Sequence, residues 1–175
     1  MDRRAFRLKM ESNLPKRKKN RLENFDYGAG YSYFITICTN NREKILSSIV
    51  GEGSSLPQLT RSGEIIKSLI ENVPTKYSNF SVDYYVIMPN HIHLLITVHN
   101  DGRENPSPTV SSFVGWFKYQ ATKQINDLID KKGTKLFQRS YYDHVIRNRS
   151  DYDQVSKYIW ENPINWENDE LYKED

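Results

Sequence analysis

Cysteine and long hydrophobic runs are scarce in this 175-residue sequence. Its one cysteine, Cys38, excludes an intramolecular disulfide framework and a metal site built from several cysteines. No apolar run approaches the ~20 residues that cross a bilayer, and no apolar segment follows the basic start as a secretory signal requires. The sequence also has no internal repeat and no low-complexity block. These absences predict a single cytoplasmic domain with no membrane partner.

Aromatic residues and separated charges are what the sequence does contain. Its 12 Tyr, 7 Phe and 3 Trp suffice for a packed core. The net charge of +3 conceals nine Lys or Arg against two acidic residues in 1–22, and six acidic residues against Lys173 in 161–175. We therefore interpret residues 1–24 as a basic arm whose Lys18 and Lys19 contact phosphates. A solvated tail that only aids solubility fits the same charges equally well.

Apolar spacing predicts the order β-α-β-β-α-β-α. Period-two and β-branched stretches indicate strands, and spacing of three and four residues indicates helices. This order favours an α+β sandwich with helices on one face of an antiparallel sheet. The expected elements are a strand at 31–39, a helix over 65–73 ended by Pro74, strands at 82–88 and 91–98 joined by a Pro89-Asn90 turn, a helix at 109–130, an extended stretch at 141–146, and a helix from Ser150 to Asn162.

Two histidines share one face of the expected strand 91–98. Period two points His91 and His93 to one side and Ile92 and Leu94 to the other. Their ring nitrogens can therefore reach one metal ion. Most His-x-His pairs are ordinary strand residues, and the pair alone is therefore a weak signal. A metal site also needs a third ligand.

The last helix places Tyr158 and Asn162 one turn apart on the same face. A polar pair in that position can complete a site at the sheet. The ordinary structural roles are a half-buried core tyrosine and an asparagine that ends the helix before Pro163. The helix pattern alone leaves both interpretations open.

Three blocks of the sequence together resemble the REP-associated tyrosine transposases, which belong to the single-tyrosine HUH endonuclease superfamily. The resemblance covers roughly residues 16–166, and the blocks occur in the expected order. They are residues 33–39 with Arg42, residues 85–96 with the His-Ile-His core, and residues 137–147 followed by Tyr158-Ile-Trp-Glu-Asn-Pro163.

The resemblance implies a ferredoxin-like antiparallel sheet with helices packed on it and a catalytic helix at the C-terminus, within a domain of residues 25–175. It implies that His91 and His93 hold Mg²⁺ or Mn²⁺, that Tyr158 is the nucleophile and that Asn162 is the third ligand. The expected activity is cleavage and strand transfer on single-stranded hairpin DNA through a 5′-phosphotyrosine, near the nucleoid. The resemblance leaves a monomer and a homodimer both open, and no residue stands out as a base for the tyrosine.

Several surface cations are candidates for contacts with DNA phosphates, although a solvated charge is an equal alternative for each. They are Lys118, Lys123, Arg139 and Arg147. Asp143 and His144 could instead form a structural pair that supports the catalytic helix, which is the interpretation favoured for Asp143, whereas a phosphate contact is the alternative for His144. Two rival functions remain: a hairpin DNA-binding protein with vestigial catalysis, and a small zinc hydrolase that uses the two histidines.

Overall fold

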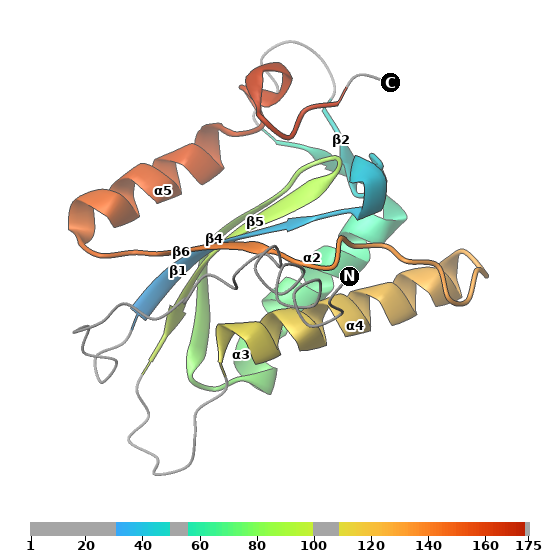
Figure 1. Cartoon of the computed structure of the whole chain (residues 1–175), viewed down its shortest axis with the longest axis horizontal. Coiled ribbons are helices and arrows are strands. Elements are labelled where there is room, and N and C mark those ends of the chain that lie inside the picture. Colours follow the sequence, from blue (N-terminus) through green and yellow to red (C-terminus); the bar gives the residue numbers. More distant parts are fainter. Residues whose placement is uncertain (1–30, 50–55, 100–108, 174–175) are drawn as a thin grey trace, which may run out of the picture.

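The computed structural model describes residues 31–49, 56–99 and 109–173 (Figure 1), so the predicted basic arm lies outside the described residues. Among the described residues, no helix is long and apolar enough to cross a membrane. The elements are β1 (Tyr31–Cys38), η1 (Asn40–Arg42), β2 (Ser47–Ser48), β3 (Gln58–Leu59), α2 (Arg61–Glu71), α3 (Val73–Lys76), β4 (Phe80–Ile87), β5 (His91–Val98), α4 (Val110–Leu128), β6 (Tyr142–Val145), α5 (Arg149–Glu161) and η2 (Trp166–Asn168).

The main sheet has four antiparallel strands in the order β4-β5-β1-β6. β4 and β5 form the predicted hairpin, whereas β1 is the inner strand between β5 and β6. The two crossover helices follow β1 and β5, so each crossover skips one strand of the sheet. This is the ferredoxin-like arrangement that the family resemblance implies, and it places the histidine strand in the middle of the sheet.

Helices cover both faces of the sheet (Figure 1). α2 and α4 pack on one face, where Ile35, Ile37 and Leu94 enter the larger hydrophobic core. α5 crosses the opposite face and packs Ile159 against Leu95. The prediction of helices on one face is therefore right for α2 and α4 and wrong for α5. The reason is visible in β5, whose first six residues are all buried, because an inner strand with two apolar faces needs cover on both.

Local chemistry explains where the helices begin and end. The Thr60 side chain caps α2 by accepting a hydrogen bond from Gly63 N. A Cβ at Gly63 would lie 2.1 Å from Leu46 O, so this close approach requires glycine. Pro74 does not end the first helix as predicted; α2 stops at Glu71, and Pro74 lies in the first turn of α3, where its missing N–H is harmless.

The last helix begins one residue earlier than predicted. α5 starts at Arg149, and Asn148 caps it, because the Asn148 side chain accepts a hydrogen bond of 2.9 Å from Asp151 N. Ile159 is almost fully buried and packs against the sheet in one cluster with Val155. Burial of such a side chain stabilises the fold by about 1.5–3 kcal/mol, which fixes the face that α5 turns toward the histidines.

Candidate metal and tyrosine site

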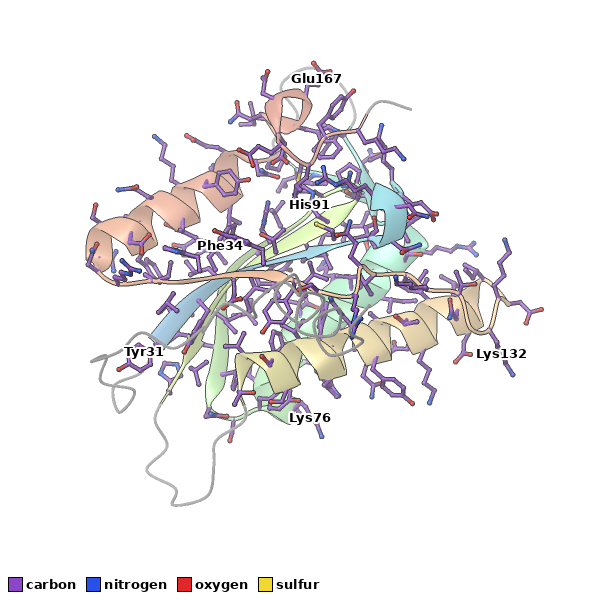
Figure 2. All side chains as sticks on the ribbon, in the orientation of Figure 1. Tyr31, Phe34, Lys76, His91, Lys132 and Glu167 are labelled. Carbon is purple, nitrogen blue, oxygen red and sulfur yellow. The ribbon has the colours of Figure 1, made fainter. Side chains whose placement is uncertain are left out.

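The two histidines lie at the start of β5, on the sheet face that α5 covers. His91 and His93 are both buried, and their ring centroids are 4.5 Å apart. Figure 2 shows His91 and Phe34 on the side of the sheet that faces α5 and the C-terminal turn. Burial lowers the pKa of His91 to about 4 and the pKa of His93 well below its ordinary value. Both rings are therefore neutral at pH 7, which is the form that binds metals.

One nitrogen of each imidazole is held by a neighbour, and the other is left for the site. His91 Nδ1–H donates to Asn90 Oδ1 at 2.8 Å, which leaves a lone pair on Nε2. His93 Nδ1 lies 2.8 Å from Thr36 Oγ1 on the adjacent strand. Partners of this kind fix the orientation of metal-binding histidines. His91 Nε2 is buried and has no hydrogen-bond partner, so it is available as a ligand.

The tyrosine predicted as nucleophile meets the histidine pair. α5 carries Tyr158, which is 45% exposed, and its Oη lies 3.5 Å from His93 Nε2. The phenol ring contacts Phe34 edge-on, with the ring centroids 5.8 Å apart. Burial, together with the charge and hydrogen bond of Asp169, raises the pKa of Tyr158 to about 12. The hydroxyl is therefore protonated at neutral pH.

Asn162 reaches the same place from the end of α5. Its side chain is buried, and Nδ2 donates to Asp169 Oδ2 at 2.6 Å. Burial has the largest effect on the pKa of His91 and lowers it, while the charge of Asp169 and the nearby Asn162 side chain raise it. Asn162 Oδ1 is buried and has no hydrogen-bond partner. The predicted third ligand thus turns an unsatisfied oxygen toward the histidine pair.

Asp169 is the site residue that the sequence prediction missed. It follows η2, and its carboxylate accepts hydrogen bonds from Tyr158 Oη at 3.3 Å, from Asn162 Nδ2, and from Leu171 N at 2.6 Å. The candidate ligand atoms of His91, His93 and Asp169 all lie within 4.8 Å of one another. Asp169 lies in the acidic tail, where its only sequence signal was charge, and no helical spacing links it to Tyr158.

The segment that carries Asp169 is tied to the histidine end of the sheet. Asn90 Nδ2 donates to Leu171 O at 2.9 Å, while the Oδ1 of the same amide holds His91. Arg42 donates to Glu170 O at 3.1 Å. The Trp166 ring lies 5.9 Å from the His91 ring, centroid to centroid. One asparagine therefore couples the C-terminal segment to a candidate metal ligand.

The donor set fits a divalent cation. Two neutral imidazoles, an amide oxygen and a carboxylate oxygen converge, and two of these atoms are buried without partners. Buried polar atoms are rarely left without a hydrogen-bond partner, so these two atoms indicate a site that can bind a cation. Nitrogen and oxygen donors together suit Mn²⁺, and the oxygen donors suit Mg²⁺.

The residues predicted to contact DNA occupy different environments. Half-buried Lys118 donates to the carbonyl oxygens of Gln138 at 2.9 Å and Ser140 at 2.7 Å, so it holds the segment before β6 in place. Lys123, Arg139 and Arg147 are exposed. DNA contact stays a prediction for all four residues. Lys18 and Lys19 lie outside the described residues.

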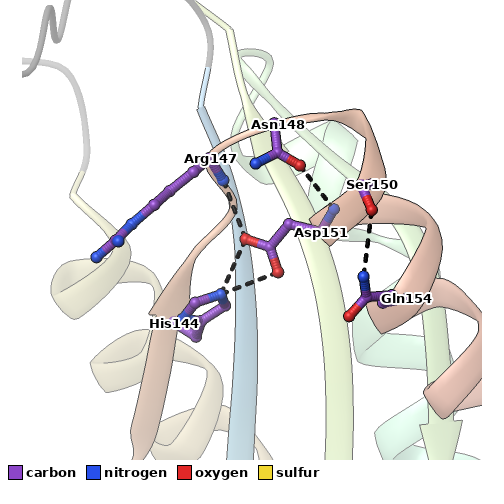
Figure 3. A network of polar contacts seen from close by, with 6 residues as sticks. All are labelled: His144, Arg147, Asn148, Ser150, Asp151 and Gln154. Atoms are coloured by element: carbon purple, nitrogen blue, oxygen red, sulfur yellow. Dashed lines mark hydrogen bonds and ion pairs between the residues drawn. The ribbon is translucent and has the colours of Figure 1, made fainter.

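A polar network fixes the connection from β6 into α5 (Figure 3). His144 Nε2 pairs with the Asp151 carboxylate at 3.0 Å, and Arg147 N donates to the same carboxylate. His144 therefore supports the helix through Asp151 and not through Asp143, its expected partner. Figure 3 also shows the Arg147 side chain extending away from this network.

Comparisons with known proteins agree with this fold. The model of the IS200-like transposases matches residues 28–162, and the chain belongs to that family. An uncharacterised protein of Haemophilus influenzae strain Rd is 32% identical over 183 residues, with 94% of this chain and 97% of that protein covered.

Among solved structures, a REP-associated tyrosine transposase bound to a REP hairpin matches with a TM-score of 0.54 and 22% identity. The match covers 83% of this chain and 74% of that one. The chain thus has the fold of a REP-associated tyrosine transposase, as the sequence blocks predicted. Membership of the family makes it a DNA-processing protein of the transposase type.

Proposed function

We propose that this protein is a metal-dependent single-strand DNA endonuclease and strand transferase that acts on hairpin DNA with Tyr158 as its nucleophile. The observation that carries the proposal is the convergence of Tyr158 Oη, His93 Nε2 and the Asp169 carboxylate in one site. A tyrosine with only a structural role in the core would not require a hydrogen-bonded carboxylate and a neutral histidine beside its hydroxyl.

The reaction is a transesterification at a DNA phosphodiester. Tyr158 Oη forms a bond to phosphorus while the bond from phosphorus to the 3′ oxygen breaks, and the departing oxygen leaves with the electron pair and takes a proton. The products are a 5′-phosphotyrosine and a 3′-hydroxyl. Attack on this link by another 3′-hydroxyl reverses the step and joins strands without an external energy source.

The proton of Tyr158 needs an acceptor, because the pKa of about 12 keeps the phenol neutral. Asp169 Oδ2 already accepts the hydroxyl hydrogen bond at 3.3 Å, and we assign it that role. Asn162 Nδ2 donates to the same oxygen and orients it. The sequence prediction left this base unidentified, since Asp169 approaches Tyr158 only through the folding of the C-terminal segment.

We assign the divalent cation to His91, His93 and Asn162, with Asp169 as an additional carboxylate ligand. A bound Mg²⁺ or Mn²⁺ supplies Lewis-acid polarisation of a non-bridging phosphate oxygen and offsets the negative charge near the phenol. The chain's own contribution is to hold both imidazoles neutral and to aim their Nε2 atoms through Asn90 and Thr36.

Hairpin DNA is the substrate we favour. The REP-associated transposase with the same fold is bound to a REP hairpin, and the exposed side chains of Arg139 and Arg147 are available for contacts with the phosphates of a bound strand. Because one chain brings Tyr158 to His93, cleavage within a single protomer is supported.

The test is the formation of a covalent adduct. Wild-type protein, incubated with end-labelled hairpin DNA and Mn²⁺, is expected to give a protein–DNA band that survives denaturing electrophoresis. Tyr158→Phe removes the nucleophile and should abolish the band. Tyr152→Phe, on the same helix but bonded to Asp83 and not to the histidines, is the matched control and should retain it.

The outcomes separate the rival functions. Hairpin binding without any wild-type adduct would support a binding protein with vestigial catalysis. Zn²⁺-dependent cleavage that persists in Tyr158→Phe would support the hydrolase. An adduct that needs Tyr158, His91 and His93 together supports the transferase.

A further inference from the structure

A cavity of about 520 Å³ opens beside Tyr158 and His93. Its floor is β1, its outer wall is the segment before β6 and the start of that strand, and Tyr158 with the C-terminal segment forms its roof. The cavity is within the size range of typical ligand sites, ~300–1,000 Å³. It is lined by Phe34, Thr36, Cys38, His93, Gln138, Ser140, Tyr141, Tyr142, Tyr158, Asp169, Glu170 and Leu171.

The walls are aromatic and carry no cation. Phe34 lies at the floor against His93, with the ring centroids 5.0 Å apart, and Tyr142 stands at the rim with 63% of its surface exposed. β6 pairs Tyr142 with Thr36, which sets it on the α5 face of the sheet. The described residues that line the cavity include no lysine or arginine, but they include Asp169 and Glu170.

The aromatic lining, whose described residues include no lysine or arginine, determines which part of a DNA strand can enter the cavity. This lining supplies no cation of its own to hold a phosphate, whereas a neutral, flat group can stack on an aromatic ring. Gln138 contributes an amide at the wall, and a glutamine amide can both donate to and accept from the edge of a base. Single-stranded DNA presents such flat groups because its bases are not paired.

We propose that the cavity is a subsite for one unpaired nucleobase of the substrate strand, next to the phosphate that Tyr158 attacks. This inference rests on the proposed function, since Tyr158 forms both the roof of the cavity and the edge of the histidine site. A base stacked between Phe34 and Tyr142 fixes the strand so that the adjoining phosphate lies at Tyr158. The cavity thus selects an unpaired position and excludes a regular duplex, whose bases are not free to enter.

The proposal is tested by binding, so that chemistry is not needed. The probe is a fluorescent hairpin oligonucleotide with oligothymidylate flanks, titrated by anisotropy in Mn²⁺ with the Tyr158→Phe protein. Single abasic sites are moved along the flanks. One flank position is expected to be sensitive, with binding about 5- to 150-fold weaker when its base is removed, the range of one stacked base.

The same position should lose its sensitivity when the aromatic wall is removed. Tyr142→Ala is expected to weaken binding of the intact probe by a similar factor and to leave the abasic probe unaffected. Tyr119→Ala is the matched control, because Tyr119 is 64% exposed on α4, outside the cavity, and should change neither probe.

The proposal is overturned if no abasic position matters, or if the abasic site and Tyr142→Ala weaken binding independently. The latter outcome would make Tyr142 a contact to the backbone. If removing the base and removing the Tyr142 ring have coupled effects on binding, but the wild-type protein forms no covalent adduct, the subsite stands and the proposed function is rejected. An adduct without such coupling would reject only the subsite.

Discussion

The Asp169 carboxylate accepts three hydrogen bonds, and one of them comes from the candidate nucleophile. Its charge and hydrogen bond raise the pKa of Tyr158 beyond the effect of burial. Asp169→Asn should therefore bring this pKa down from about 12 toward the ordinary 10, while burial keeps it above that value. Adduct formation should nevertheless fall, because the proton acceptor is gone.

Ultraviolet difference titration of phenolate absorbance measures this shift, with Tyr158→Phe subtracted to isolate the residue. Tyr152 has a similarly raised pKa, to about 12, but it owes part of this shift to Asp83. Its titration should not move in Asp169→Asn and serves as the internal control. An unchanged Tyr158 titration would contradict the assigned contact.

Thr36 and Asn90 hold the imidazoles without touching the expected cation. Thr36→Val keeps the shape of the side chain but removes the partner of His93 Nδ1. Loss of such a partner weakens metal binding by about 10- to 100-fold, and calorimetric titration with Mn²⁺ should show this decrease. Ser32→Ala, on the same strand, removes a hydrogen bond to Thr97 far from the histidines and should leave the affinity unchanged.

At the scale of elements, α5 is held at its beginning by charge as well as by packing. Asp151 accepts from His144 and from Arg147 N, and it lies in the first turn, where a negative charge favours the helix dipole. Asp151→Ala should lower the free energy of unfolding by about 1–2 kcal/mol, measured by urea denaturation. If the weakened start of α5 also displaces Tyr158, the rate of adduct formation should fall in the same variant.

Asp153→Ala is the matched control for that measurement. Asp153 pairs with Arg149 at 2.9 Å, but both side chains are more than half exposed. Exposed pairs of this kind stabilise a protein by ~0.2–1 kcal/mol or less. Equal losses from the two alanine variants would show that the network at Asp151 contributes no more than an ordinary surface ion pair.

Periodicity explains which parts of the elements and the site could be predicted. The period of two in β5 and the period of 3.6 in α5 are local, so they place His91 beside His93 and Tyr158 above Asn162 before any tertiary contact is known. The cover of both sheet faces was not predictable in this way, because α5 is amphipathic whichever face it packs against. The sequence does not distinguish Lys118 from an ordinary surface lysine, because the carbonyl groups that it binds come from a distant segment.

For the molecule as a whole, the candidate site is assembled from segments that are far apart in sequence. β5 supplies the histidines, the end of α5 supplies Tyr158 and Asn162, and the segment after η2 supplies Asp169. The position of Asp169 beside the histidines depends on the turn after Pro163 and on the hydrogen bond from Asn90 to Leu171 O. Neither the turn nor that contact follows a repeat in the sequence, so Asp169 could be found only in the folded chain.

A site built from three segments predicts that metal binding stabilises the entire fold. A ligand at one hundred times its Kd adds about 2.7 kcal/mol to the free energy of unfolding, which for a chain of this size raises Tm by roughly 5–10 °C. Thermal denaturation monitored by circular dichroism in Mn²⁺, and separately in Mg²⁺, measures the rise. The double variant His91→Gln with His93→Gln keeps polar side chains at both positions but removes the imidazoles, so its Tm should not respond. An equal rise in this variant would place the stabilising cation elsewhere on the protein and reject the ligand set.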